Sequence, residues 1–188
     1  YLPRFAGDRL PESRAGIAVA LADKIDSVCA FFAIGQAPSG SQDPYALRRA
    51  ASGVVNIILH HQLELSLRDA AAYAFELLEH DVPGFSAREF KNSVEAFIAF
   101  HSQRMETILG EAGFSYDTVN AIKKIGSGEA NMLHMLRRAQ ALGLYRHDRH
   151  FPRLLAGFNR VFNILRSAPD KLPENGAAPD IDPLLFSD

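Results

Sequence analysis

Cysteine is almost missing from this sequence, since Cys29 is the only one among 188 residues. One cysteine forms no disulfide within the chain and gives no CxxC pair, so a disulfide scaffold and a cysteine-rich zinc site are excluded. No apolar run approaches the ~20 residues of a transmembrane helix, and no charged and then apolar leader precedes a cleavage site. The sequence therefore predicts a protein with a cytoplasmic location and no membrane partner.

The glycine motifs of common nucleotide sites are also missing. The sequence has no GxxxxGK[ST] loop, no GxGxxG and no GxSxG elbow, which removes the signatures of P-loop proteins, dinucleotide-binding folds and serine hydrolases. Apolar residues make up 47% and charged residues 22%, a composition that argues against disorder along the whole chain. The chain opens on Tyr1 rather than methionine, and we expect it to be an internal piece of a longer protein.

The dominant period of the sequence is helical. Asp43 followed by Pro44 is predicted to start a helix, and Ser66 and Ser86 are predicted N-caps. No stretch shows convincing alternation with period two, so the predicted fold is an all-α bundle of about six or seven helices with no sheet. The expected helices cover about 13–33, 44–61, 67–80, 87–111, 116–125, 128–142 and 151–167.

We expect residues 1–168 to form one helical domain. Gly143 is predicted to stop the sixth helix. Residues 169–188 contain four prolines and several acidic side chains, a composition that predicts an extended linker. In the last helix, the residues predicted to face inward are Leu154, Phe158, Val161 and Leu165.

The net charge of −2 hides an uneven distribution. Residues 1–122 carry a net charge of −5, residues 123–166 carry +7, and residues 167–188 carry −4. A basic block this dense attracts a polyanion. The alternative is a set of solvated helix faces without a ligand.

Histidines and aspartates are the candidate metal ligands. His80-Asp81 is an HD dipeptide, the centre of a metal-dependent phosphohydrolase site, but no second His-rich element has matching spacing, which favours an ordinary helix end. His60 and His61 point about 100° apart on a helix, so they cannot chelate one ion together. His101 lies on an apolar stripe and is predicted to be a hydrogen-bonded core residue.

Two further short segments have features that could bind a phosphate. A second HD dipeptide, His147-Asp148, is flanked by Arg146 and Arg149, which repel a metal ion and attract an anion. The GSG sequence at 126–128 could seat one phosphate on backbone N–H groups, although an interhelix turn is the simpler interpretation.

Arg48 and Arg49 occupy the first turns of the second predicted helix. Cations are unfavourable there because the N-terminal end of a helix dipole is positive. They therefore need an anionic partner, and two remain open: an ion pair with Asp23 or Asp26, or a nucleic-acid phosphate.

Several stretches resemble the beta subunit of bacterial glycyl-tRNA synthetase, the tetrameric two-subunit type. The string ending in "DPYALRRAA" is the most specific of them, and a looser similarity covers nearly the whole chain. The similar stretches are "YLPRFAGDRLP" (1–11), "VALADKIDSV" (19–28), "FAIGQAPSGSQDPYALRRAASGV" (32–54) and "NRVFNIL" (159–165).

This resemblance implies an internal segment of the beta subunit. Residues 1–35 would end a degenerate HD-type domain, with Asp23 at the former metal-ligand position, and an anticodon-binding domain would follow Asp188. Aminoacylation, with its ATP and magnesium, would belong to the alpha subunit, so no catalytic residue, cofactor or metal is expected here. Asn159 departs from the family pattern, where a lysine is usual.

We therefore predict a non-catalytic segment that binds tRNA(Gly) and scaffolds the beta subunit of an alpha2beta2 enzyme, which attaches glycine to tRNA(Gly) using ATP. The expected partners are tRNA(Gly), the alpha subunit and the rest of the beta subunit, with no DNA. The alternatives are a purely structural or interaction module and a residual HD-type metal-dependent phosphohydrolase. The residues predicted to neutralise phosphates of an A-form stem are Arg48, Arg49, Lys123, Lys124, Arg137, Arg138, Arg146, Arg149 and Arg153.

Overall fold

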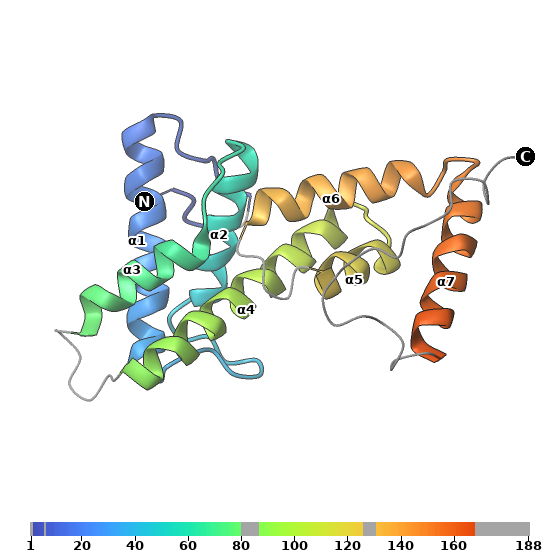
Figure 1. Cartoon of the computed structure of the whole chain (residues 1–188). Coiled ribbons are helices and arrows are strands. Elements are labelled where there is room, and N and C mark those ends of the chain that lie inside the picture. The colour runs from blue at the N-terminus through green and yellow to red at the C-terminus, as the bar shows by residue number, and fades with distance from the viewer. Residues whose placement is uncertain (1, 6, 80–86, 126–130, 168–188) are drawn as a thin grey trace, which may run out of the picture. The chain divides into compact units, whose positions relative to one another are not determined.

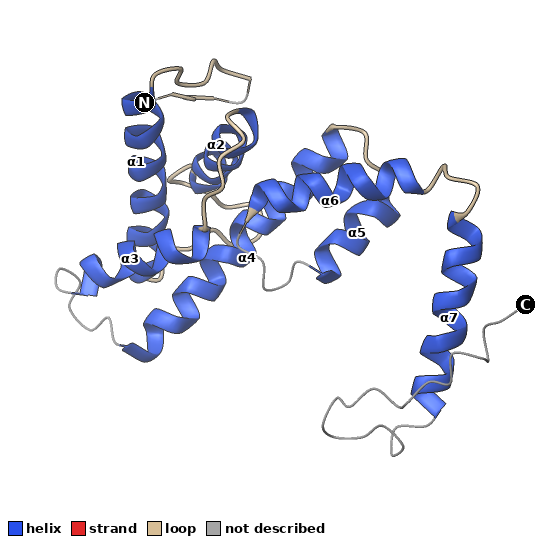
Figure 2. Ribbon diagram, turned by 45° about the horizontal axis from the view of Figure 1, so that its top comes forward, coloured by secondary structure: helices blue, strands red, loops and turns tan. Residues whose placement is uncertain are grey.

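The computed structural model describes residues 2–5, 7–79, 87–125 and 131–167, and within these ranges it is all-helical (Figures 1 and 2). The predicted all-α fold without a sheet is confirmed, and every predicted helix has a counterpart. The seven helices are α1 (Arg14–Ala33), α2 (Leu47–His60), α3 (Leu67–Glu79), α4 (Ala87–Glu111), α5 (Tyr116–Ile125), α6 (Met132–Tyr145) and α7 (Phe151–Ser167).

The chain divides into two compact units, residues 1–144 and residues 145–188. In the first unit, α1 packs against α2, α3 and α4, and α4 also packs against α2, α3 and α5. The long helix α4 therefore forms the middle of this unit. The predicted linker and the predicted caps and turns at Ser86, His80-Asp81 and 126–128 lie outside the described residues.

The core of the first unit is apolar and continuous. On α4 the fully or nearly fully buried residues recur every three or four positions, as an amphipathic helix requires. This stripe includes Val94, Phe97, Ile98, Met105 and Leu109. It meets side chains of the other helices in one hydrophobic cluster, which holds the helices of the unit together.

The predicted start of α2 at Asp43-Pro44 is wrong by three residues. Residues 43–46 form a turn in which the Ala46 N–H donates to the Asp43 carbonyl at 3.2 Å, and Ala46 has a φ of 56°, in the left-handed region. That conformation is incompatible with a continuing helix, so α2 begins at Leu47. The Asp43 carboxylate still caps the helix, because it accepts from the backbone N–H of Leu47 at 2.8 Å and of Arg48 at 3.0 Å.

Replacing Asp43 with alanine should lower the free energy of unfolding by about 1–2 kcal/mol, because two N–H groups at the start of α2 lose their acceptor. Urea unfolding followed by circular dichroism measures this change. Glu76→Ala, an exposed substitution on α3, is the matched control and should cost less than about 0.5 kcal/mol. Equal losses in the two variants would show that the cap contributes nothing specific.

The predicted end of α6 before Gly143 is wrong, and its predicted start near residue 128 lies outside the described residues. The helix begins at Met132, after Asn131 Oδ1 accepts from the backbone N–H of His134 at 3.1 Å. It continues through Gly143 to Tyr145. An interior glycine costs a helix only about 1 kcal/mol, so Gly143 is no obligatory stop.

The apolar face of α7 does not face inward as predicted. Leu154, Phe158, Val161 and Leu165 are 67, 65, 55 and 44% exposed. The part of the second unit that the structure describes contains no other helix, so nothing there covers this face. The periodicity was correct for a helix, but periodicity alone does not supply a packing partner.

Candidate nucleic-acid interface

The predicted RNA-binding residues lie in several separate places. Six belong to the first unit: Arg48 and Arg49 in the first turn of α2, Lys123 and Lys124 in the last turn of α5, and Arg137 and Arg138 on α6. Arg146, Arg149 and Arg153 belong to the second unit, where all three are exposed.

The Arg48 side chain is hydrogen-bonded to the loop before α2. Its guanidinium donates to the carbonyl of Gly40 at 2.6 Å and to that of Gln42 at 3.3 Å. Arg49, the next residue, is exposed and lines a small pocket together with Asp23. Among the described residues neither arginine forms an ion pair with Asp23 or Asp26, and the carboxylate at this helix start is that of Asp43.

Arg137 forms an ion pair with a carboxylate. Its Nη1 lies 2.9 Å from Oε1 of Glu64, and both side chains are at least half exposed. The hydrogen bond and the positive charge of Arg137 lower the pKa of Glu64. Because solvent screens such an exposed pair, the arginine is only loosely held and remains accessible to a competing phosphate.

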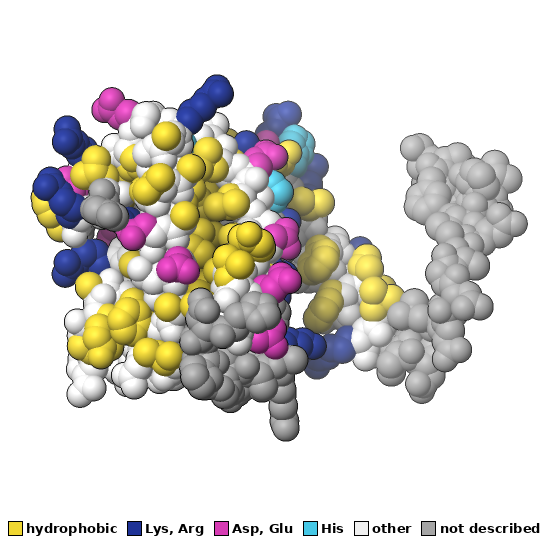
Figure 3. Space-filling view, turned by 90° about the vertical axis from the view of Figure 1, so that its left-hand side faces the viewer, with side chains coloured by type: hydrophobic (Ala, Val, Ile, Leu, Met, Phe, Trp, Pro, Cys, Tyr) yellow, Lys and Arg dark blue, Asp and Glu magenta, His cyan; other side chains and the backbone are white. Residues whose placement is uncertain are grey.

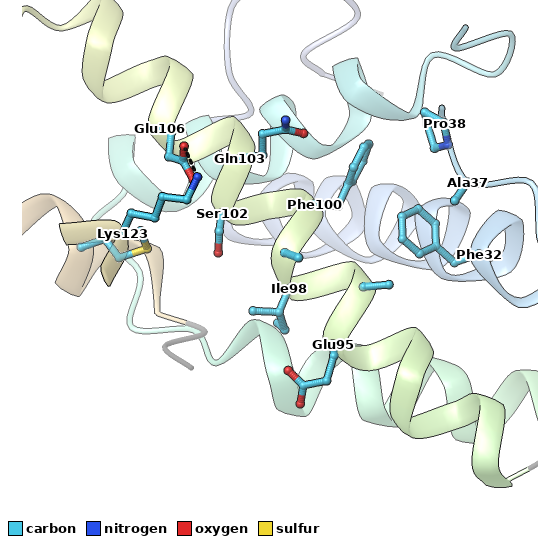
Figure 4. A pocket seen from close by; sticks show the side chains of 13 residues that line it. Phe32, Ala37, Pro38, Glu95, Ile98, Phe100, Ser102, Gln103, Glu106 and Lys123 are labelled. Atoms are coloured by element: carbon cyan, nitrogen blue, oxygen red, sulfur yellow. Dashed lines mark hydrogen bonds and ion pairs between the residues drawn. The ribbon is translucent and has the colours of Figure 1, made fainter. Parts of the chain in front are cut away.

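Lys123 is also paired with an acid. Its Nζ lies 3.2 Å from Oε2 of Glu106 across the contact between α5 and α4. Figure 4 shows this pair at one end of a groove of about 750 Å³, with Phe32 and Pro38 at the other end. Glu95 also lines the groove. Its lining is therefore apolar and acidic, which suits an RNA phosphate poorly.

The basic residues of the first unit do not gather at one point. Arg48 and Arg49 lie at the start of α2, whereas Arg137 contacts Glu64, four residues beyond its end. The fourteen residues of α2 span roughly 20 Å, which is about the distance between its start, with Arg48 and Arg49, and its end near the Arg137–Glu64 pair. On the face shown in Figure 3, apolar and acidic side chains occupy the middle, and lysines and arginines lie toward the edges. The structure thus gives separate clusters rather than one basic face in this unit.

His101 is a buried, hydrogen-bonded core residue, as predicted. Its side chain is fully buried, and its Nδ1 lies 2.9 Å from the carbonyl oxygen of Phe97. Because a carbonyl only accepts, Nδ1 carries the proton, and Nε2 is left without a partner. Burial lowers the pKa of His101 to about 4. The imidazole is therefore neutral at physiological pH.

The other histidine and aspartate candidates have structural contacts. His61 Nε2 lies 2.8 Å from the carbonyl oxygen of Pro11, which ties the end of α2 to the segment before α1. Asp148 accepts from the backbone N–H of His150 at 2.7 Å, just before α7. Within the described ranges no group of three or more His, Cys, Asp or Glu side chains could hold a metal ion, so Asp23 has no ligand set around it there.

Lys24 is a candidate that sequence reasoning missed. It lies on α1 among Leu21, Ile25 and Val28, and its side chain is only 7% exposed. The available signal was a lysine on the buried stripe of an amphipathic helix, a position that charged residues occupy rarely without a partner.

In the described part of the chain, no helix meets the length and apolarity needed to cross a bilayer.

The chain belongs to the glycyl-tRNA synthetase beta subunit family, whose family model matches residues 1–124. Among curated relatives it is similar to the glycine–tRNA ligase beta subunits of Halothermothrix orenii, Shouchella clausii and Clostridioides difficile. The identities are 42, 38 and 35% over 87, 90 and 100% of this chain. These matches cover 23, 24 and 26% of the relatives, so the chain spans about a quarter of their length.

Proposed function

We propose that this chain is a non-catalytic, tRNA-binding and scaffolding segment of a glycine–tRNA ligase beta subunit. In this proposal the parent alpha2beta2 enzyme works in the cytoplasm, the alpha subunit uses ATP and magnesium to activate glycine, and the segment holds tRNA(Gly). Lysine and arginine side chains neutralise phosphates of an A-form stem without strong base specificity.

The observation that carries the proposal is family membership combined with the basic block at 123–166. In this block Lys123, Lys124, Arg137 and Arg138 are all exposed on α5 and α6. Exposed cations on rigid helices can approach a polyanion without refolding the chain. Lys123 and Arg137 pair with the carboxylates of Glu106 and Glu64, and the several phosphates of a polyanion compete together with such partly exposed pairs.

Charge reversal at Arg137 and Arg138 tests the proposal. The double variant Arg137→Glu/Arg138→Glu should bind tRNA(Gly) about 10-fold or more weakly, and the slope of log affinity against log salt should fall by about 2. Fluorescence anisotropy at several salt concentrations measures both quantities, and circular dichroism checks that the helices persist.

The matched control for this experiment is Arg9→Glu/Arg14→Glu, which changes the net charge equally at two exposed positions outside the proposed surface. Its affinity should fall clearly less. Equal losses in the two double variants would mean that only the overall charge matters. An unfolded Arg137→Glu/Arg138→Glu variant would instead make these arginines structural.

The scaffolding part of the proposal is supported by α7. Its exposed apolar side chains recur with helical spacing along one helix, and large exposed apolar patches are typical of protein–protein contacts. The proposed partners are the alpha subunit or other parts of the beta subunit. The exposed apolar residues of α7 are Leu154, Leu155, Phe158, Val161, Phe162, Ile164 and Leu165.

A further inference from the structure

A lysine with a buried stem and no counterion among the described residues points to a ligand site outside the predicted basic block. Lys24 is only 7% exposed, and among the described residues it makes no hydrogen bond or ion pair. Its stem packs so closely on Gly53 that a Cβ there would lie 3.0 Å from Lys24 Cε and 3.2 Å from Cδ. Lys24 Nζ is not among the described atoms that are buried without a partner, so the ammonium reaches the surface without a counterion and is available to a bound anion.

Lys24 lines a pocket of about 360 Å³ between α1 and the start of α2. Arg49 and Arg4 line the same pocket, and Asp23 contributes a carboxylate. Arg4 is neutralised by Asp8, since its Nε lies 3.0 Å from Asp8 Oδ2. Lys24 and Arg49 therefore outweigh Asp23, and the pocket has a net positive charge that suits a phosphate.

Another part of the pocket lining is aromatic rather than charged. Tyr45 stacks on Phe31 with ring centroids 4.1 Å apart and an angle of 24° between the rings, and both residues line the pocket. Tyr45 is 50% exposed, so Phe31 covers part of the ring and leaves the rest accessible. Exposed aromatic rings beside cations are where proteins stack the bases of unpaired nucleotides.

We propose that this pocket binds one unpaired nucleotide of an RNA, with its phosphate at Lys24 and Arg49 and its base on Tyr45. The inference rests on the proposed RNA-binding function and deepens it, because it adds a site for a single nucleotide to the contacts with a stem. The pocket volume lies in the range of small-ligand sites. The Asp23 carboxylate opposes the phosphate and can accept a hydrogen bond from a ribose hydroxyl.

The test uses the 188-residue chain, with AMP and inorganic phosphate as probes and NMR chemical shifts of the labelled protein as the readout. AMP should shift signals of Lys24, Arg49 and Tyr45. Lys24→Met, which keeps the stem and removes the charge, should weaken AMP binding about 10-fold or more. Lys91→Met removes an exposed charge from α4 and should change it less than about 2-fold.

Tyr45→Ala is the second variant, and it keeps the test valid if Lys24→Met does not fold. It should weaken binding of AMP and leave binding of inorganic phosphate unchanged. Unaltered AMP binding in Lys24→Met or in Tyr45→Ala would overturn the inference. Equal affinity of the wild-type chain for phosphate and AMP would overturn the assignment of a nucleotide.

A tRNA titration separates the inference from the function on which it rests. Added tRNA(Gly) should displace AMP from the pocket, and AMP that stays bound beside tRNA would overturn the assignment to RNA. If tRNA does not bind while AMP binding depends on Lys24, the pocket is supported as a nucleotide site and the proposed tRNA function fails. If tRNA binds and Lys24→Met changes neither ligand, the function stands and the pocket assignment is overturned.

Discussion

Lowering the pH from 7 to 4 should destabilise the first unit by about 3 kcal/mol through His101 alone. The neutral imidazole is buried in the core, with Nδ1 bonded to the Phe97 carbonyl and Nε2 without a partner. Protonation would place a charge and an unmatched N–H donor among apolar side chains, which explains why burial lowers the pKa of His101 to about 4.

The direction of this pH effect follows from the two pKa values. In the unfolded chain His101 has an ordinary pKa of about 6.5, so between pH 6.5 and 4 the unfolded state binds the extra proton. The contribution of His101 is therefore fully present above about pH 6.5 and is lost as the pH falls towards 4. Glu64 and Glu95, whose pKa values are lowered by Arg137 and Arg68, add a further loss under acid conditions.

A His101→Leu variant separates the histidine from the carboxylates. Urea unfolding at several pH values should show a pH dependence smaller by about 3 kcal/mol in this variant than in the wild type. His60→Leu, at an exposed position, should keep the wild-type pH dependence. Identical pH profiles for the wild type and His101→Leu would contradict the buried neutral imidazole.

Phe97→Ala should destabilise the first unit by about 3–5 kcal/mol, the usual cost of removing a buried phenylalanine. The Phe97 side chain is fully buried on α4, and its ring centroid lies 4.1 Å from that of His101. Its removal leaves a cavity in the core beside α4, the helix that contacts α1, α2, α3 and α5. Thermal and urea unfolding followed by circular dichroism measure the change.

The control for this prediction is Tyr73→Ala, at an aromatic side chain of α3 that is 64% exposed. It should cost less than about 1 kcal/mol. A small effect of Phe97→Ala would mean that the core around α4 collapses into the vacated space. A large effect of Tyr73→Ala would mean that exposed aromatic residues also support the unit.

The helices were predictable because apolar residues recur every three or four positions, and the buried residues of α4 follow that pattern. Helix ends were harder to predict, because they depend on side-chain hydrogen bonds that a sequence only suggests. Asp43 does lie at the start of a helix and caps it, but the left-handed Ala46 shifts the start of α2 to Leu47, and the cap at Asn131 was not predicted.

The candidate site was less predictable than the fold, for two physical reasons. Charge counting identifies cations but not their partners, so the contacts of Arg48 with Gly40 and Gln42 could not be foreseen. Burial also depends on neighbours that are distant in sequence. Lys24 is enclosed partly because Gly53, on another helix, leaves space for its stem.

The pairs Arg137–Glu64 and Lys123–Glu106 have a consequence for selectivity under the proposed function. Each cation already has a tethered counterion, which a ligand must displace before it can bind. A lone anion gains too little from one such exchange to prevail over an attached carboxylate, whereas an RNA strand that delivers several phosphates together gains from all of them at once. If the proposed function holds, these acids therefore favour the binding of extended polyanions over that of small anions.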